Sequence, residues 1–144
     1  MVDVTEPLDV TEPLVVVDGA NVVGSRPDGW WRDRAGAARR LLATLSGGVP
    51  WPGEVVLVLE GAARAGVAAG MVDGVRVVHA AGSGDDTMVD LVRAAGPGRT
   101  VTVVTADRGL RDRVTALGAA VAGPSAVWAH RGGSDPHPHP PRRS

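Results

Sequence analysis

Residues 14–21 read Leu-Val-Val-Val-Asp-Gly-Ala-Asn, and this stretch decides the fold. Four consecutive apolar residues without polar alternation are typical of a strand that is covered on both faces. The run ends in an acidic residue, Asp18. Three more apolar runs, at 55–59, 75–78 and 101–105, lead in turn to Glu60, to the pair Asp85-Asp86 and to Asp107. The sequence therefore predicts several strands that lead into carboxylates.

Helical patterns separate these runs. A helix is predicted over about 32–46, because its apolar positions recur on one face, and its buried stripe is Trp31, Ala35, Ala38, Leu42 and Leu45. Further helices are predicted over 85–95 and over 110–117, where Leu110, Val114 and Leu117 mark the apolar face. We expect a loop after the first strand, a short helix within 61–73 and a final short strand at 119–122.

Alternating strands and helices require crossover connections. They predict an α/β fold, a three-layer α/β/α sandwich with a mainly parallel sheet of four to five strands. In open sheets of this kind the functional site lies beyond the carboxyl ends of the strands. The acids should therefore gather there. Two carboxylates about 4 Å apart repel by roughly 4 kcal/mol at an effective dielectric constant near 20, so the cluster favours a divalent cation as counter-ion.

The ends of the chain differ in composition from its middle. The hexapeptide Asp-Val-Thr-Glu-Pro-Leu occurs twice, at 3–8 and at 9–14, with no helical or strand period. Residues 1–13 are therefore predicted to be a flexible leader. From Arg131 onward the chain consists of Gly, Ser, Asp, Pro, His and Arg, which cannot form a core, so 131–144 is predicted to be a disordered tail. Residues 14–130 are the predicted folded domain.

Several residue types are missing, and their absence excludes functions. All 15 basic residues are arginine, which rules out a Walker-type phosphate loop and a Schiff base, since both need lysine. The lack of cysteine excludes disulfides, thiolate nucleophiles and cysteine-zinc sites. No apolar stretch reaches 18 residues and no signal-peptide pattern is present, so we expect no membrane partner and a cytoplasmic protein. The net charge of −1 argues against binding DNA by bulk charge.

The acids occur in motifs with chemical meaning. Asp18 and Asn21 stand three residues apart around Gly19, which lets the backbone bend tightly. Asp107 is followed by Arg108, whose guanidinium is suited to holding a phosphate. Aspartates that open helices are also common N-caps, which is an alternative explanation for Asp107 and for the Asp85-Asp86 pair. The two roles are compatible.

These motifs resemble a known family. Asp-Gly-x-Asn at 18–21, Asp85-Asp86 at the start of a helix and Thr-x-Asp at 105–107 are similar to the NYN subgroup of the PIN-like nucleases, over about residues 14–125. The resemblance implies a PIN-like fold and a metal-dependent ribonuclease. Its implied site positions are Asp18, Asn21, Asp85, Asp86 and Asp107. Glu60 matches a strand-end acid of part of the superfamily.

The resulting hypothesis is an Mg²⁺- or Mn²⁺-dependent ribonuclease that acts on single-stranded or structured RNA through a metal-activated water. The candidate metal ligands are Asp18, Asp86, Asp107 and Glu60. The phosphates flanking the cleaved bond are expected to contact Arg108, Arg32, Arg39 and Arg40. RNA is therefore the expected partner. The oligomeric state stays open, with a homo-oligomer among the options.

Other functions remain open at this stage. Some relatives have an acid where this chain has Arg111, which leaves open whether one or two metals bind and keeps an RNA-binding module without cleavage activity as an alternative. A Mg²⁺-dependent nucleotide phosphohydrolase is a further alternative. An aspartate-nucleophile phosphatase is disfavoured, because Ala20 stands where its second acid would be. Trp31 is expected in the core with Trp30 covering it, although one of them could stack on a base.

Overall fold

The computed structural model describes residues 12–130. The predicted tail and residues 1–11 of the predicted leader lie outside this part of the chain. Glu12 and Pro13, which the sequence pattern assigned to the leader, lie beside the sheet. The backbone N–H of Glu54 donates a hydrogen bond to the Pro13 carbonyl at 2.9 Å. The described part of the chain therefore makes sheet contacts from just before the first predicted strand.

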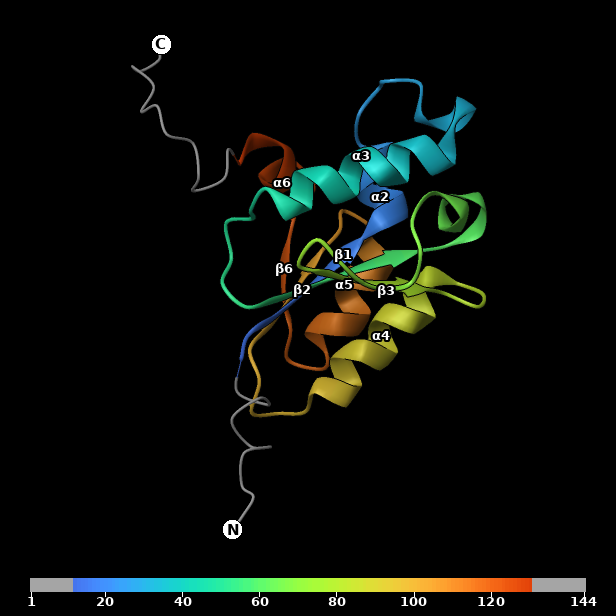
Figure 1. The fold of residues 1–144 in the computed structure, drawn as a ribbon. Coiled ribbons are helices and arrows are strands. Elements are labelled where there is room, and N and C mark those ends of the chain that lie inside the picture. The colour runs from blue at the N-terminus through green and yellow to red at the C-terminus, as the bar shows by residue number, and fades with distance from the viewer. Residues whose placement is uncertain (1–11, 131–144) are drawn as a thin grey trace, which may run out of the picture.

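Six strands form one sheet in the order β3-β4-β2-β1-β5-β6 (Figure 1). Every pairing is parallel except that of β3 with β4, which is antiparallel. The sheet is mainly parallel, as predicted, and has one strand more than the predicted four to five. The strands are β1 Leu14–Asp18, β2 Glu54–Leu59, β3 Gly70–Val72, β4 Val75–His79, β5 Val101–Val104 and β6 Ala120–Ala122.

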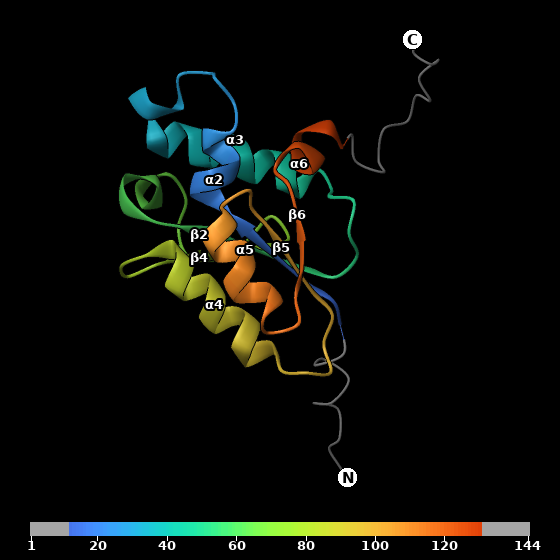
Figure 2. The ribbon, with the colours of Figure 1, turned by 180° about the vertical axis from the view of Figure 1, so that it is seen from behind.

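Helices cover both faces of the sheet, as Figures 1 and 2 show from opposite sides. One face carries α2 Gly19–Gly24, α3 Arg34–Ser46 and α6 Ser125–Ala129, and the other carries α4 Gly84–Ala95 and α5 Arg108–Thr115. Two short 3₁₀ helices, η1 Trp30–Arg32 and η2 Gly61–Gly66, complete the structure. The predicted three-layer sandwich is confirmed. No helix within residues 12–130 has the length and apolarity needed to cross a bilayer.

The apolar strands supply two cores at once. Successive side chains of a strand point to opposite faces, so an unbroken apolar run fills both. In β1, Val15 and Val17 pack on the α3 side, while Leu14 and Val16 pack on the α4 side. All four are at most 4% exposed. The interior position of β1 explains why its sequence shows no alternation.

The segment 61–73 differs from its predicted short helix. It begins with the 3₁₀ helix η2 and then forms β3, which turns back into β4. Asp73 and Gly74 both have positive φ, 51° and 85°, as the two central residues of a type I′ hairpin turn require. Asp-Gly between Val72 and Val75 was the local signal for this hairpin. The residues after β1 also differ from the prediction, because they form α2 instead of a loop.

Two predicted core residues are exposed. Trp31 is 52% exposed and Leu117 is 41% exposed. Helix α3 begins only after its N-cap, Asp33, whose carboxylate accepts the Gly36 N–H at 2.8 Å, so Trp31 lies outside the helix. Leu117 similarly lies beyond the end of α5. The remainder of the α3 stripe is confirmed at Ala38, Leu42 and Leu45, with Ala35 half-buried.

The order of the strands reverses at β1. The chain leaves β1 for β2 on one side and returns through α4 to β5 on the other. The carboxyl ends of β1 and β5 therefore flank the crevice in which open α/β sheets place their sites. Gly19 allows α2 to start in this crevice directly after β1. A Cβ atom at Gly19 would lie 2.5 Å from the Val58 carbonyl oxygen of β2.

Replacing Gly19 should therefore destabilise the protein. We expect Gly19→Ala to lower the free energy of unfolding by about 1–3 kcal/mol, because α2 must move away from β2. Gly24→Ala is the matched control at the other end of α2, where the nearest atom to the new Cβ would be 3.7 Å away. It should change stability by less than about 0.5 kcal/mol. Urea denaturation measures both, and equal effects would contradict the close packing of α2 on β2.

Candidate active site

Four carboxylates from separate segments line one open cavity of about 230 Å³ at the carboxyl ends of the strands. The lining residues are Asp18, Ala20, Asn21, Glu60, Asp85 and Asp107. They come from the end of β1 and the start of α2, from the end of β2, from the start of α4 and from the loop after β5. The structure therefore brings together the acids that the strand pattern placed at this edge. Asp86 is absent from the lining.

Asp18 is the buried member of the group, with 6% exposure. One of its carboxylate oxygens, Oδ1, accepts the backbone N–H of Asn21 at 3.2 Å and so caps α2. The other, Oδ2, accepts the hydroxyl of Thr105 at 2.8 Å. Both oxygens are therefore fixed, one by the following helix and one by the residue that follows β5 across the crevice.

Asn21 and Thr105 connect the two sides of the crevice. The side-chain oxygen of Asn21 accepts the backbone N–H of Ala106 at 2.8 Å. The Thr105 hydroxyl, which donates to Asp18, also accepts the backbone N–H of Asp107 at 3.0 Å. This network holds the end of β1 against the loop that leads into α5. Asn21 therefore has a positioning role in addition to its place in the cavity lining.

Asp107 combines a structural contact with a place in the cavity. Its Oδ1 accepts the backbone N–H of Leu110 at 3.0 Å and caps α5. The capping interpretation from the sequence is therefore confirmed for Asp107. The same side chain lines the cavity. Capping at this edge of the sheet does not remove a carboxylate from the site.

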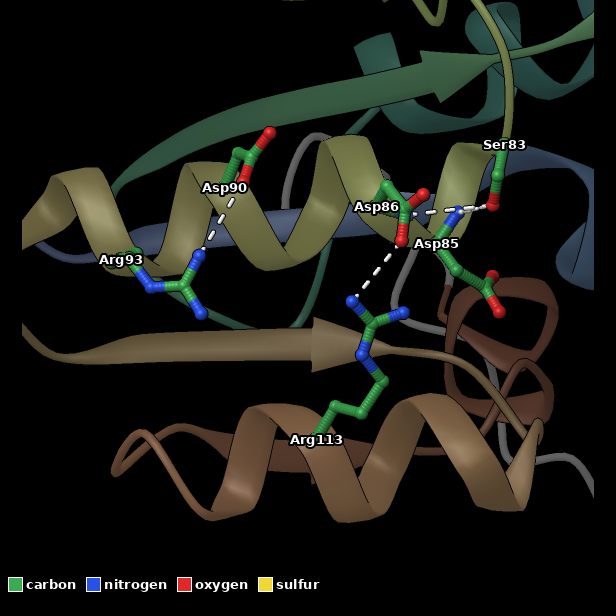
Figure 3. Close-up of polar contacts among 6 residues, drawn as sticks. All are labelled: Ser83, Asp85, Asp86, Asp90, Arg93 and Arg113. Carbon is green, nitrogen blue, oxygen red and sulfur yellow. Dashed lines mark hydrogen bonds and ion pairs between the residues drawn. The ribbon is translucent and has the colours of Figure 1, made fainter.

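Asp85 and Asp86 have different surroundings, and neither caps its helix. Ser83 is the N-cap of α4, and its hydroxyl oxygen accepts the N–H groups of Asp85 and Asp86 at 3.1 and 3.5 Å. Figure 3 shows the Asp86 carboxylate facing Arg113, with 3.1 Å between the paired atoms, and the Asp85 carboxylate turned away from that pair. Adjacent residues of a helix do not share a face. Asp85 therefore reaches the cavity, and Asp86, which the sequence hypothesis gave as a metal ligand, does not line it.

The apolar stripe of α4 carries the signal that separates the two aspartates. Met88 and Val92 are buried, and Asp85 precedes them at the helical spacings of three and seven residues. Asp85 thus continues the inward face of α4 by one turn. Asp86 and Asp90 follow the exposed face instead, and Asp90 pairs with Arg93 at 3.5 Å. Extending the stripe backwards would have selected Asp85 from sequence alone.

Glu60 joins the end of β2 to the start of α4. Its Oε1 accepts the backbone N–H of Gly84 at 2.6 Å. A Cβ atom at Gly84 would overlap that oxygen, so the close approach depends on glycine. Glu60 is half-buried and lines the cavity beside Asp18 and Asp85. The sequence prediction for Glu60, which matched a strand-end acid in only part of the superfamily, therefore falls inside the site.

Burial and mutual repulsion raise the pKa of two of these acids. Burial raises the pKa of Asp18 above 3.8, hydrogen bonds from Thr105 and Asn21 partly oppose the shift, and the charges of Asp85 and Glu60 add to it. Burial also raises the pKa of Asp85, the charges of Asp107 and Glu60 raise it further, Arg113 acts in the opposite direction, and Asp86 raises it by the smallest contribution. The neighbouring acids are thus close enough to disfavour the charged forms of Asp18 and Asp85.

The donor set matches the chemistry of a hard divalent cation. Carboxylate and amide oxygens are the ligands that Mg²⁺ and Mn²⁺ take in proteins. Within residues 12–130, no three acidic or histidine side chains stand close enough together to hold an ion between them as they are. A bound ion would therefore require carboxylates to rotate towards it. The donor atoms of these residues suit the ion, but their side chains do not form a coordination shell in this structure.

The predicted phosphate-binding arginines lie outside the acid cavity. Arg32, Arg39 and Arg40 are exposed on η1 and α3, and Arg40 lines a different cavity. Arg108 is exposed at the first position of α5, directly after Asp107. Of these four, Arg108 is therefore the one whose place in the chain puts it next to a cavity residue. The sequence hypothesis did not select Arg34 or assign Thr105 a role, although both contribute to this edge of the sheet.

Comparison with known proteins supports the fold. No protein-family model matches the chain, and no curated protein matches it in sequence. Among solved structures, the chain is similar to the crystal structure of a variant of Rae1 (YacP) from Bacillus subtilis, with a TM-score of 0.64 and 16% identity. The match covers 81% of this chain and 72% of that chain. The chain has a PIN-like fold. At this level of identity the similarity shows the fold alone, and membership of the NYN subgroup stays a prediction.

The raised pKa of Asp85 predicts a pH-dependent effect on stability. An acid whose pKa is raised by folding contributes stability below its ordinary pKa, and that contribution is lost as the pH rises through the raised value. We therefore expect Asp85→Asn to raise the melting temperature at pH 7 in EDTA, by an amount that shrinks as the pH falls towards 3.8. Because Asp85 is only half-buried, the gain should be a few tenths of a kcal/mol.

Asp86→Asn is the control for this measurement. It removes a neighbouring carboxylate that pairs with Arg113 and is exposed. We expect a smaller gain in melting temperature at pH 7, or none, because the loss of the ion pair with Arg113 offsets the small relief of Asp85. Equal stabilisation by both variants would show that general surface charge, and not repulsion within the cavity, determines the effect.

Proposed function

We propose that this chain is a metal-dependent ribonuclease whose active site is the acid cavity at the carboxyl ends of β1, β2 and β5. The supporting observation is the convergence of four carboxylates from separate segments on one cavity whose lining contains no basic residue. The cavity lies at the point where the strand order reverses, which is the usual position of a site in this class of fold.

Mg²⁺ or Mn²⁺ is the proposed cofactor, and Asp18, Asp85, Asp107 and Glu60 are its proposed ligands. Asp85 replaces Asp86 in this set, because Asp85 lines the cavity and Asp86 pairs with Arg113. When bound, the ion would activate a water for attack on phosphorus and offset the charge of the scissile phosphate. The ligand set consists of oxygen donors alone, in keeping with the absence of cysteine from the chain.

The residues around the acids have defined tasks in this proposal. The Thr105 hydroxyl and the Asn21 N–H hold the Asp18 carboxylate in place. Asn21 also holds the loop before Asp107 through Ala106. Asp85 makes no side-chain hydrogen bond within residues 12–130 and lines the cavity, so its carboxylate is available to accept a hydrogen bond from a water there. Arg108, which is exposed directly after Asp107, is the proposed contact for a phosphate next to the one that reacts.

RNA is the proposed substrate. A polyanion approaching a negative cavity needs positive groups around it. Arg108 follows the cavity residue Asp107 directly, and further exposed arginines lie on η1 and α3. These groups would hold flanking phosphates while the ion neutralises the reacting one. A free nucleotide would not need such an extended surface.

Substitution of single acids should distinguish the proposed metal ligands from a neighbouring acid outside the cavity. We expect Asp18→Asn and Asp85→Asn to reduce Mn²⁺-dependent cleavage of a labelled oligoribonucleotide by about 100-fold or more, the scale of losing one charge-stabilising group from an active site. Asp86→Asn should cleave the RNA at a rate within about threefold of the parent rate, because its exposed ion pair with Arg113 contributes little. Loss of cleavage in Asp86→Asn with retention in Asp85→Asn would reverse the assignment of the two aspartates.

Metal binding can be measured without cleavage. We expect Mn²⁺ to raise the melting temperature of the parent protein, since an ion that binds only the folded state at 100 times its Kd adds about 2.7 kcal/mol. The shift should be lost in Asp85→Asn and kept in Asp86→Asn. Calorimetry checks the same contrast. RNA binding without any Mn²⁺ affinity would indicate a non-cleaving binding module, and hydrolysis of nucleoside triphosphates but not RNA would indicate a phosphohydrolase.

A further inference from the structure

A second cavity of about 350 Å³ adjoins the acid cavity. Ala20 and Glu60 line both, so the two cavities are adjacent. The second cavity lies between α2, η1, the start of α3 and the turn from β2 into η2. Its lining is Gly19, Ala20, Val23, Trp30, Arg34, Leu59, Glu60, Gly61, Ala62 and Ala63. Figure 1 shows η1 and η2 at the same end of the molecule, beyond the carboxyl ends of the strands.

The lining is mainly apolar, with one aromatic wall. Leu59 is 1% exposed, and Val23 and Ala63 are half-buried. Trp30 is also half-buried, and the Arg34 guanidinium lies 4.8 Å from the centre of its ring. Indole rings and guanidinium groups are both surfaces on which the bases of single-stranded nucleic acids stack.

The two neighbouring tryptophans differ in this respect. The rings of Trp30 and Trp31 meet edge to face, with centroids 6.0 Å apart and planes at 89°. Trp31 is 52% exposed and does not line the cavity. Trp30 thus faces a cavity while its neighbour in the chain faces solvent, and neither occupies the core position that the helical stripe predicted for Trp31.

Polar groups at the edge of the cavity suit a nucleobase. Glu60 can accept hydrogen bonds from the amino or ring N–H groups of a base, and Arg34 can donate to a ring nitrogen or carbonyl oxygen. The volume lies at the small end of the range of about 300–1,000 Å³ that is usual for small-molecule sites. A flat aromatic body with a polar edge meets both the apolar lining and the polar rim.

We propose that this cavity, formed chiefly by Trp30, Arg34, Val23 and Leu59, is a base pocket that binds one nucleobase of single-stranded RNA. It rests on the proposed function, since the phosphate attached to that nucleotide would lie at the acid cavity. The adjacency of the two cavities, which share Ala20 and Glu60, determines the occupant. A ligand that fills both must join an apolar aromatic group to an anionic group, which is the composition of a nucleotide.

Nuclear magnetic resonance on the unmodified protein tests the pocket directly. The chain has four tryptophans, and their indole N–H signals can be assigned with single Trp→Phe variants. In EDTA, uridine and adenosine, which lack the phosphate that the acids would repel, should shift the Trp30 signal and leave the Trp31 signal in place. Ribose, which has no base, should leave both signals in place. A Trp30 signal that is unmoved at millimolar nucleoside, or that ribose moves equally, would overturn the base pocket.

Two tryptophan variants provide a matched comparison with RNA itself. Fluorescence anisotropy with a labelled RNA octamer in EDTA should show about 5- to 150-fold weaker binding for Trp30→Ala, because stacking on one base contributes about 1–3 kcal/mol and 1.4 kcal/mol is tenfold. Trp31→Ala should change the Kd less than twofold. Ala62→Leu narrows the pocket while keeping Trp30, and it should weaken binding as well. Equal effects of the two tryptophan variants would overturn the proposal.

The magnetic resonance and anisotropy measurements test the base pocket separately from the proposed function. Both are made without divalent metal, so a protein that never cleaves RNA can still show the Trp30 response, and then only the nuclease proposal fails. Metal-dependent cleavage with no Trp30 response would overturn the base pocket alone. A mononucleotide that binds as tightly as the octamer would overturn the assignment of the pocket to RNA.

Discussion

The hydrogen bond from the Thr105 hydroxyl to the Asp18 carboxylate is the interaction on which the site depends. It joins the carboxyl ends of β1 and β5 across 87 positions of sequence and gives a buried carboxylate a partner. A buried charge without a partner would destabilise the fold by several kcal/mol. The bond from the Ala106 N–H to Asn21 crosses the same crevice. These contacts hold the two sides at a fixed separation, and the cavity is the space between them.

Negative charge is paired with arginine at one end of the sheet and not in the acid cavity at the other. At the amino ends of the strands, Glu54 is paired with Arg76 at 2.6 Å and with Arg99 at 2.9 Å. Burial acts to raise the pKa of Glu54, but hydrogen bonds and charge from the two arginines hold it below its ordinary value. At the carboxyl ends the pKa values of Asp18 and Asp85 are raised. None of the arginines within residues 12–130 lines the cavity, and this contrast is the main physical support for an external cation.

The sequence alone was sufficient to predict which strand ends meet at this edge of the sheet. It was not sufficient to predict the position of every side chain there. Apolar runs predict buried strands, and parallel strands bring their final residues together, so the convergence of Asp18, Glu60 and Asp107 follows from pattern alone. The choice between Asp85 and Asp86 depends on the rotation of α4, which is set by the packing of its buried stripe. The exposure of Trp31 depends on where α3 begins, and the Asp33 cap makes that start later than the apolar period indicated.

Helix capping and a role in the site have a common origin here. Helices that follow parallel strands begin at the same edge where the strands end, so their first N–H groups and the strand-end acids meet. The positive ends of the α4 and α5 dipoles also stabilise nearby carboxylates, which helps the fold to tolerate their repulsion. Asp18 and Asp107 are therefore expected at this edge on structural grounds alone. Asp85 is different, because Ser83 already caps α4, so the Asp85 carboxylate gains the favourable helix dipole but no capping hydrogen bond in return for the repulsion it experiences. The case for a cation site consequently depends more on Asp85 than on Asp18 and Asp107, whose carboxylates also stabilise the fold.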